Sequence, residues 1–116
     1  MKVNITVKGL EGSGKSDSIR NFITESFAKV EDFCNKEHWE PINVDLIATV
    51  SALHAKHEFE AHIRAAHFKV IVKKEDSDLY KLITRVMDVT LEELHDHKRR
   101  ELDKKKHGDN GFNRPG

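Results

Sequence analysis

The stretch KVNITVKGLEGSGKSDSIRNF, residues 2–22, decides the fold because it carries two signals that point to different architectures. Its first six residues alternate, with Val3, Ile5 and Val7 on one face, which is typical of a half-buried strand. Residues 9–16, GLEGSGKS, then match the full P-loop pattern, in which backbone N–H groups at the start of a helix bind phosphate. The strand, loop and helix could therefore belong to a nucleotide-binding parallel sheet or to a different fold.

The residues around the loop argue against nucleotide binding. A P-loop strand lies inside a parallel sheet that is covered on both faces, so it should be continuously apolar, but Asn4 and Thr6 interrupt this strand. Such a site also needs a carboxylate at the end of a second apolar strand to hold magnesium, and Asp45 lies near the start of its strand. We therefore interpret the segment as a glycine-rich turn before a helix that Ser16 or Ser18 caps.

A small nucleotide-binding enzyme remains the alternative, with Gly9–Ser16 as its phosphate loop. In that interpretation Lys15 reaches the outer phosphates and the Ser16 hydroxyl binds magnesium. Micromolar affinity for magnesium-ATP that the Lys15→Ala substitution abolishes would support it.

The remaining sequence predicts an α+β fold with the order β-α-β-β-β-α, a four-stranded sheet with two helices packed on one face. Apolar residues at spacings of three and four predict a first helix that starts at Ser16 and ends before Pro41. Strands are expected at 42–51, 58–66 and 67–75. Because these strands alternate, one face of the sheet needs cover and the other is expected to face solvent.

The second predicted helix spans 78–106, and one of residues 76–78 can cap its start. Its apolar stripe consists of Leu79, Ile83, Val86, Thr90 and Leu94. At about 1.5 Å per residue the helix is about 43 Å long, which is longer than a four-stranded sheet can cover. We therefore expect its basic end to project from a domain of residues 1–106, followed by a flexible tail at 107–116.

The charges balance overall but not along the chain. Lys plus Arg and Asp plus Glu each number 20, whereas residues 98–116 contain seven basic and three acidic residues. A basic end of this kind suggests a local contact with a polyanion. No apolar run is long enough to span a membrane.

Several residues that could carry chemistry have simpler structural interpretations. Cys34 is the single cysteine, so it can form no intramolecular disulfide, and we expect it to be a buried apolar residue. Trp39 is expected to cover an edge of the core rather than to stack on a base. Two residues apart on a helix, His95 and His97 face away from each other. The histidines supply no evident zinc ligand set, so we expect no metal and no cofactor.

The order and spacing of several short motifs resemble those of the bacterial ribosome hibernation-promoting factors, also called ribosome-associated inhibitor A or sigma-54 modulation proteins. The similar stretches are VNITVKG, VDLIATV, HAKHEFEAHI and KEDSDLYKLI, and together they cover residues 1 to about 106. The matching positions are Asn4, Ile5, Thr6 and Gly9 in the first strand, Ser16, Ile19 and Arg20 in the first helix, His57, Glu60 and Ala61 in the third strand, and Asp78, Tyr80 and 98–106 in the last helix. One departure is Val89, where the family often has lysine.

This resemblance implies a non-enzymatic, cytoplasmic, monomeric protein of the short form, without the second domain of long members. It implies binding to 16S-type rRNA and neighbouring proteins of the small ribosomal subunit, in the channel for mRNA and tRNA, which silences idle ribosomes. The candidate rRNA-binding residues are Arg20, Lys29, Lys56, His57, Lys81, Arg85, Lys98, Arg99, Arg100, Lys104, Lys105 and Lys106. A generic double-stranded RNA-binding module is a further alternative, since it shares the βββα order.

Overall fold

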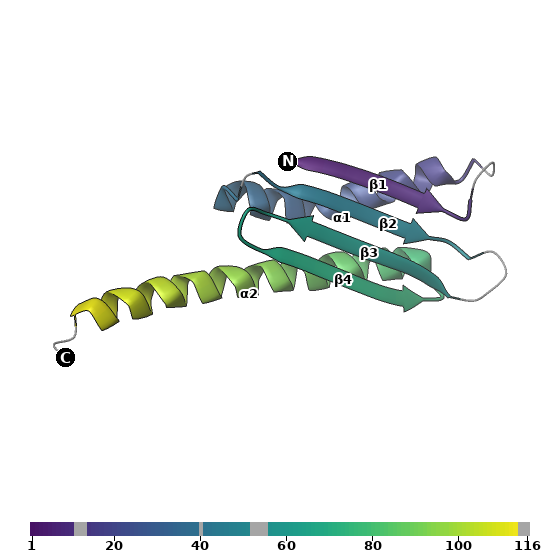
Figure 1. The fold of residues 1–116 in the computed structure, drawn as a ribbon. Helices are drawn as coiled ribbons and strands as arrows, with labels where there is room; N and C mark the ends of the chain where they lie inside the picture. The colour runs from purple at the N-terminus through teal and green to yellow at the C-terminus, as the bar shows by residue number, and fades with distance from the viewer. Residues whose placement is uncertain (11–13, 40, 52–55, 114–116) are drawn as a thin grey trace.

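The computed structural model of the protein describes residues 1–10, 14–39, 41–51 and 56–113, and the side chains of those up to Leu102. The elements are β1 (Lys2–Lys8), α1 (Ser16–Glu37), β2 (Asn43–Thr49), β3 (His57–Arg64), β4 (Lys69–Asp76) and α2 (Leu79–Asn113). Both helices lie on the same face of the four-stranded sheet, and the other face is open (Figure 1). The predicted α+β fold is confirmed.

The strand order places β1 at an edge of the sheet. The order is β1-β2-β3-β4, so β1 has β2 as its one neighbour. That pair is parallel, with Val3 opposite Val44, whereas β2–β3 and β3–β4 are antiparallel. A P-loop strand lies in the interior of a parallel sheet, and β1 does not.

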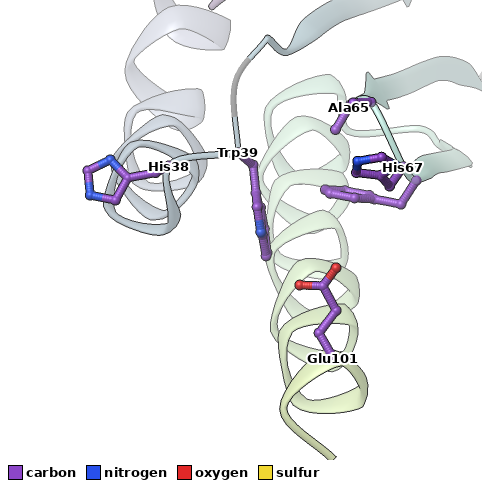
Figure 2. Close-up of a pocket in the computed structure, with 7 residues that line it drawn as sticks. His38, Trp39, Ala65, His67 and Glu101 are labelled. Carbon is purple, nitrogen blue, oxygen red and sulfur yellow. The ribbon is translucent and has the colours of Figure 1, made fainter. Parts of the chain in front are cut away.

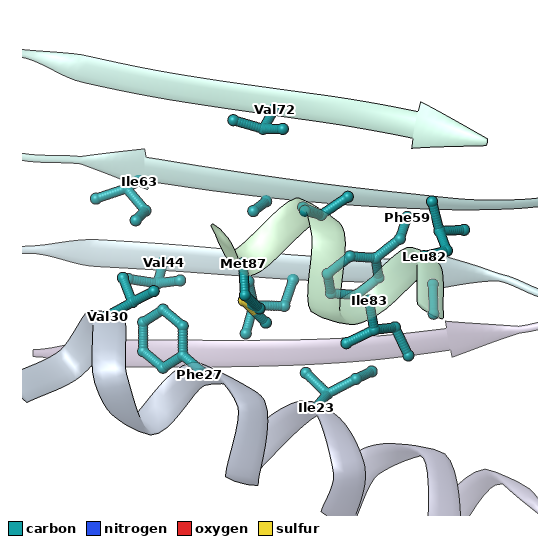
Figure 3. Packing of buried hydrophobic residues seen from close by; sticks show 14 of the residues in the cluster. Ile23, Phe27, Val30, Val44, Phe59, Ile63, Val72, Leu82, Ile83 and Met87 are labelled. Atoms are coloured by element: carbon teal, nitrogen blue, oxygen red, sulfur yellow. The ribbon is translucent and has the colours of Figure 1, made fainter. Parts of the chain in front are cut away.

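The core lies between the sheet and the helix layer, and alternate strand residues point into it (Figure 3). Phe59 and Ile63 of β3 are fully buried, as the alternation predicts. All five residues of the predicted α2 stripe are buried too, and Leu82 and Met87 join them. The stripe is wider than predicted because α2 packs against α1 as well as against β3 and β4.

The two helices start differently. Lys15 occupies the N-cap position of α1 in a helical conformation and makes no side-chain cap bond, so the predicted capping by Ser16 or Ser18 is wrong. Both serines already lie inside the helix, where a side chain cannot act as an N-cap. The prediction for α2 is confirmed, because Asp78 Oδ1 accepts the Lys81 backbone N–H at 3.1 Å.

Asp76 supports this second helix start. Its Oδ1 accepts the backbone N–H of Asp78 at 2.9 Å. That bond, assisted by the nearby charge of Lys81, lowers the pKa of the Asp76 carboxyl below its ordinary value. The carboxylate is therefore already engaged by the loop that it stabilises.

Helix α2 continues to Asn113, beyond the predicted end at Lys106. Gly108 and Gly111 lie within it, because a glycine inside a helix costs only about 1 kcal/mol relative to alanine. Since α1 ends at Glu37, the last turns of α2 extend past the body, as expected, and the molecule measures 67 × 25 × 18 Å (Figure 1). Flexibility of residues 107–116 stays a prediction, and 114–116 lie outside the described residues.

Gly9, the first glycine of the P-loop pattern, has a packing role at the end of β1. Its φ is +93°, and a Cβ placed there would lie 2.0 Å from the carbonyl oxygen of Val50. The adjacent Val50 N–H donates to the Lys8 carbonyl oxygen at 2.8 Å, which holds the ends of β1 and β2 together. Gly14 also has a positive φ of +76°, but open space surrounds it. The fold alone therefore accounts for the glycine at position 9.

Candidate nucleic-acid interface

Helices α1 and α2 lie side by side and run in the same direction. A residue further along α1 contacts a residue correspondingly further along α2. The difference between the two residue numbers therefore stays nearly constant. In order they are Phe22–Tyr80, Lys29–Asp88, Phe33–His95 and Glu37–Lys98. We call this line of contacts the helix seam. Of the predicted RNA-binding residues, Lys29 and Lys98 take part in it, and Lys81 and Arg85 lie beside it.

A shallow groove opens on the outer surface near the start of α2. Its lining residues are Phe22, Tyr80, Lys81, Thr84, Arg85 and Asp88. Sequence reasoning predicted the two cations, because both lie off the apolar stripe, and the structure leaves both exposed. It named Tyr80 as a position that matches the family but named neither Tyr80 nor Phe22 as a binding residue; the two rings meet edge-on with centroids 4.8 Å apart. The available signal was an aromatic residue, Tyr80, placed between core Leu79 and a lysine.

Several predicted cations already have partners within the protein. Arg20 Nη1 donates to the carbonyl oxygen of Ile5 at 2.6 Å, which fastens α1 to β1. Lys98 Nζ lies 2.9 Å from a carboxylate oxygen of Glu37 and 5.8 Å from the centre of the Phe33 ring. The other two pairs are Lys29–Asp88 and Arg99–Asp96. These four cations would have to exchange or share a partner to bind phosphate.

Three predicted cations of the helix layer stand out as available. Lys81, Arg85 and Arg100 are exposed and form no ion pair with any of the described side chains. A cation that is not ion-paired can bind phosphate without first giving up a carboxylate partner. Lys81 and Arg85 flank the groove, whereas Arg100 lies further along α2, toward the end that leaves the body.

The remaining candidates divide between the two ends of the molecule. Lys56 is exposed just before β3, and His57 accepts the Ser51 backbone N–H at its Nδ1, 3.0 Å away, which gives this histidine a structural role. Lys104, Lys105 and Lys106 lie on the projecting turns of α2, but their side chains are outside the described part. Their contact with RNA therefore stays a prediction.

The aromatic residues at the opposite end of the helix seam form a structural cluster beside the pocket that Figure 2 shows, where Trp39 is labelled. Trp39 packs edge-on against Phe33 and Phe68, at centroid distances of 5.6 and 5.0 Å. His97 lies against Phe68, and its Nε2 is 3.2 Å from Glu101 Oε1. A pocket of about 160 Å³ lies beside this cluster. The interpretation of Trp39 as a cover over the core edge is confirmed.

No metal centre or membrane span emerges from the part of the chain that the structure describes. Within it, no three His, Cys, Asp or Glu side chains gather around a common point. Cys34 is fully buried as expected, and burial, with a smaller effect from Glu31, raises the pKa of its thiol to about 11. Among the described helices, none is long and apolar enough to cross a membrane.

The carboxylate that a P-loop enzyme would need is absent from the end of β2. Asp45 lies opposite Asn4 near the start of the strand, and Thr49 occupies the end beside Lys8. On the open face of the sheet, Asp45 Oδ2 accepts from Arg64 Nη2 at 2.7 Å. Asp45 therefore serves a cross-strand ion pair, far from the glycine-rich loop.

Together these features define a small α+β protein whose helix layer presents exposed cations, the kind of surface that binds nucleic acid. The sequence profile of the sigma 54 modulation protein / S30EA ribosomal protein family matches residues 3–101, and the chain belongs to this family. The resemblance found from the motifs is confirmed. Membership makes the chain a ribosome-associated factor of the hibernation type.

Two solved structures share the fold. The N-terminal domain of protein Y from Thermus thermophilus is 18% identical, with a TM-score of 0.59, and the match covers 80% of this chain and 94% of that one. A ribosomal subunit interface protein from Coxiella burnetii is 17% identical, with a TM-score of 0.61, and the match covers 85% of this chain and 99% of that one. None of the curated proteins compared with the chain matches it significantly.

Proposed function

We propose that this protein binds the rRNA of the small ribosomal subunit through its helix layer. It would occupy the channel for mRNA and tRNA and so silence idle ribosomes. The family match over residues 3–101 carries this proposal, because it includes all of the sheet except Lys2, all of α1 and most of α2. The exposed cations along the helices support it, since phosphate contacts supply much of the affinity of nucleic-acid binding.

The distribution of charge suits recognition of a particular RNA surface. The formal net charge is zero, so nonspecific attraction to RNA is weak over the molecule as a whole. Lys81, Arg85 and Arg100 instead present positive charge at defined points of a rigid helix pair. Folded RNA is recognised largely by shape and by backbone contacts. A body 67 Å long with cations along one layer can make such contacts at several separated phosphates.

We propose that the protein acts in the cytoplasm as a monomer, by binding alone, without a cofactor or an enzymatic step. The edge position of β1 and the place of Asp45 weigh against a nucleotide-binding enzyme. A generic double-stranded RNA-binding module would prefer free RNA duplex to intact small subunits, and that preference separates the two proposals.

Competition with mRNA and tRNA tests the proposed location. If the protein occupies the channel, small subunits loaded with mRNA and initiator tRNA should bind it more weakly. With these ligands at about ten times their dissociation constants, mass action raises the apparent Kd of the protein about tenfold. Binding of a fluorescently labelled protein to purified subunits measures this change.

The control adds an RNA of the same length and concentration that small subunits do not bind, and it should leave the Kd unchanged. If the loaded subunits bind the protein as tightly as the empty ones do, the protein binds outside the channel and the proposed location is wrong.

A further inference from the structure

We infer that Tyr80, Lys81 and Arg85 form a site for one unpaired nucleotide of RNA. The Tyr80 ring stacks on the base, and the two cations hold the flanking phosphates. The inference rests on the proposed function and deepens it, because it names the chemical unit that this groove recognises.

The Tyr80 ring is available to a ligand because it does not pack into the core. Tyr80 is 48% exposed, although it lies between buried Leu79 and the seam contact with Phe22. The edge-on packing of Phe22 against it, at an interplanar angle of 85°, restricts the orientation of the ring. A ring held in this way loses little conformational freedom when a flat ligand stacks on it.

The other exposed apolar side chains lack these features. Among the described residues, only Ile71 and Leu102 are comparably exposed large apolar residues, at 49% each. Both are aliphatic, so neither offers a π-surface to a base. Ile71 also lies on the open face of the sheet, opposite His62 and away from the helix seam. Among the described side chains, the exposed hydrophobic aromatic surface of the helix layer therefore lies at Tyr80.

Charge complementarity favours a nucleotide as the occupant of the groove. Lys81 and Arg85 line it beside Tyr80, and neither has an ion-pair partner among the described side chains. The acidic groups nearby are already engaged: Asp88 by Lys29, Asp78 by the backbone of Lys81, and Asp76 by the backbone of Asp78. An aromatic platform with adjacent cations is the arrangement that binds single-stranded nucleic acid.

An unpaired nucleotide fits better than a base-paired one. Bases within an A-form duplex are stacked on their neighbours, so a side chain cannot cover their faces. The Tyr80 ring lies on the open surface of α2. It can therefore stack only on a base that has left an RNA duplex or lies at the end of one. The ligand is therefore a nucleotide from a loop, a bulge or a strand end.

Substitutions at Tyr80 test this site by binding to purified small subunits across a salt series. Removing a base stack costs about 1–3 kcal/mol, so Tyr80→Ala should bind about 5- to 150-fold more weakly than the parent. Its salt dependence should be unchanged because no ionic contact is lost. Tyr80→Phe keeps the ring and should bind like the parent.

The double variant Lys81→Ala with Arg85→Ala tests the two cations. It should flatten the slope of log affinity against log salt by about one to two.

Two further variants provide the controls. Ile71→Ala removes an equally exposed apolar side chain from the opposite face and should bind like the parent. Tyr80→Leu keeps an apolar side chain without the flat ring and should bind as weakly as Tyr80→Ala. Thermal unfolding of each variant establishes that it is folded at the assay temperature.

If Tyr80→Ala or Tyr80→Leu binds as tightly as the parent, no stacking occurs and the inference is overturned, while the proposed function stands. Retained affinity in Tyr80→Leu alone would identify an apolar protein contact instead of a base. If Tyr80→Phe is as weak as Tyr80→Ala, the hydroxyl and not the ring is responsible, which also overturns the inference. Absence of binding by the parent would overturn the proposed function itself.

Discussion

Gly9→Ala should lower the free energy of unfolding by about 2–5 kcal/mol. A positive φ costs about 1–2 kcal/mol in a residue that has a Cβ, and relieving the overlap with the Val50 carbonyl oxygen costs about 1–3 kcal/mol more. For a chain of this size, the change corresponds to a drop in Tm on the order of 10 °C. Thermal or urea unfolding followed by circular dichroism measures it.

Gly14→Ala is the matched control. It also has a positive φ, but an added Cβ would meet nothing within 4 Å, so the expected loss is about 1 kcal/mol. In a phosphate loop, the ligand would have to approach the backbone at both glycines. In this fold only Gly9 packs closely, against the Val50 carbonyl oxygen. Equal losses of stability in the two variants would contradict the packing role assigned to Gly9.

Replacing the three available cations of the helix layer should weaken binding to the small subunit roughly a hundredfold at about 0.1 M salt. The variant combines Lys81→Ala, Arg85→Ala and Arg100→Ala. Each phosphate contact contributes about 0.7 to 0.9 to the slope of log affinity against log salt, so the slope should flatten by about two to three. Stability should change little, because all three side chains are exposed and unpaired among the described residues. Titration of labelled protein with subunits across a salt series gives both quantities.

The control for net charge carries Lys2→Ala, Lys8→Ala and Lys69→Ala on the open face of the sheet, where all three lysines are exposed. It loses the same charge from the opposite side of the molecule. We expect it to keep most of the parent's affinity and slope. If both triple variants weaken equally, binding depends on total charge and the helix layer is not the interface.

Local patterns were sufficient to predict the architecture. Alternation in β1, with Val3, Ile5 and Val7 on one face, distinguished a one-sided sheet from a parallel sheet covered on both faces. The α2 stripe was narrower in the prediction than in the structure. Leu82 and Met87 are buried because α2 also contacts α1, and that contact depends on how two distant segments come together.

The ends of the helices were harder to predict than their cores. Asp78 caps α2 as its residue type suggests, whereas the serines near the start of α1 do not cap it. The cause is Lys15, whose backbone is already helical, so the chain enters α1 one residue before Ser16. The low helix propensity of glycine also does not end α2 at Gly108, because the helix continues through this residue.

For the candidate interface, the sequence identified the exposed cations but not their partners. Lys81 and Arg85 could be placed on the surface because they lie off the apolar stripe. The Lys98–Glu37 pair joins residues 61 positions apart, and only the parallel alignment of the two helices brings them together. The same alignment sets Phe22 against Tyr80, so neither the groove nor its aromatic wall could be predicted from local patterns.

Binding to isolated ribosomal subunits tests most directly whether this protein recognises small-subunit rRNA. Purified small and large subunits are titrated with the labelled protein at the same salt concentration, and the complexes are separated by sedimentation. We predict one protein bound per small subunit, with affinity that falls steeply as salt rises, and only weak, unsaturable binding to large subunits. Equal binding to both subunits, or no binding to the small one, would contradict the proposed function.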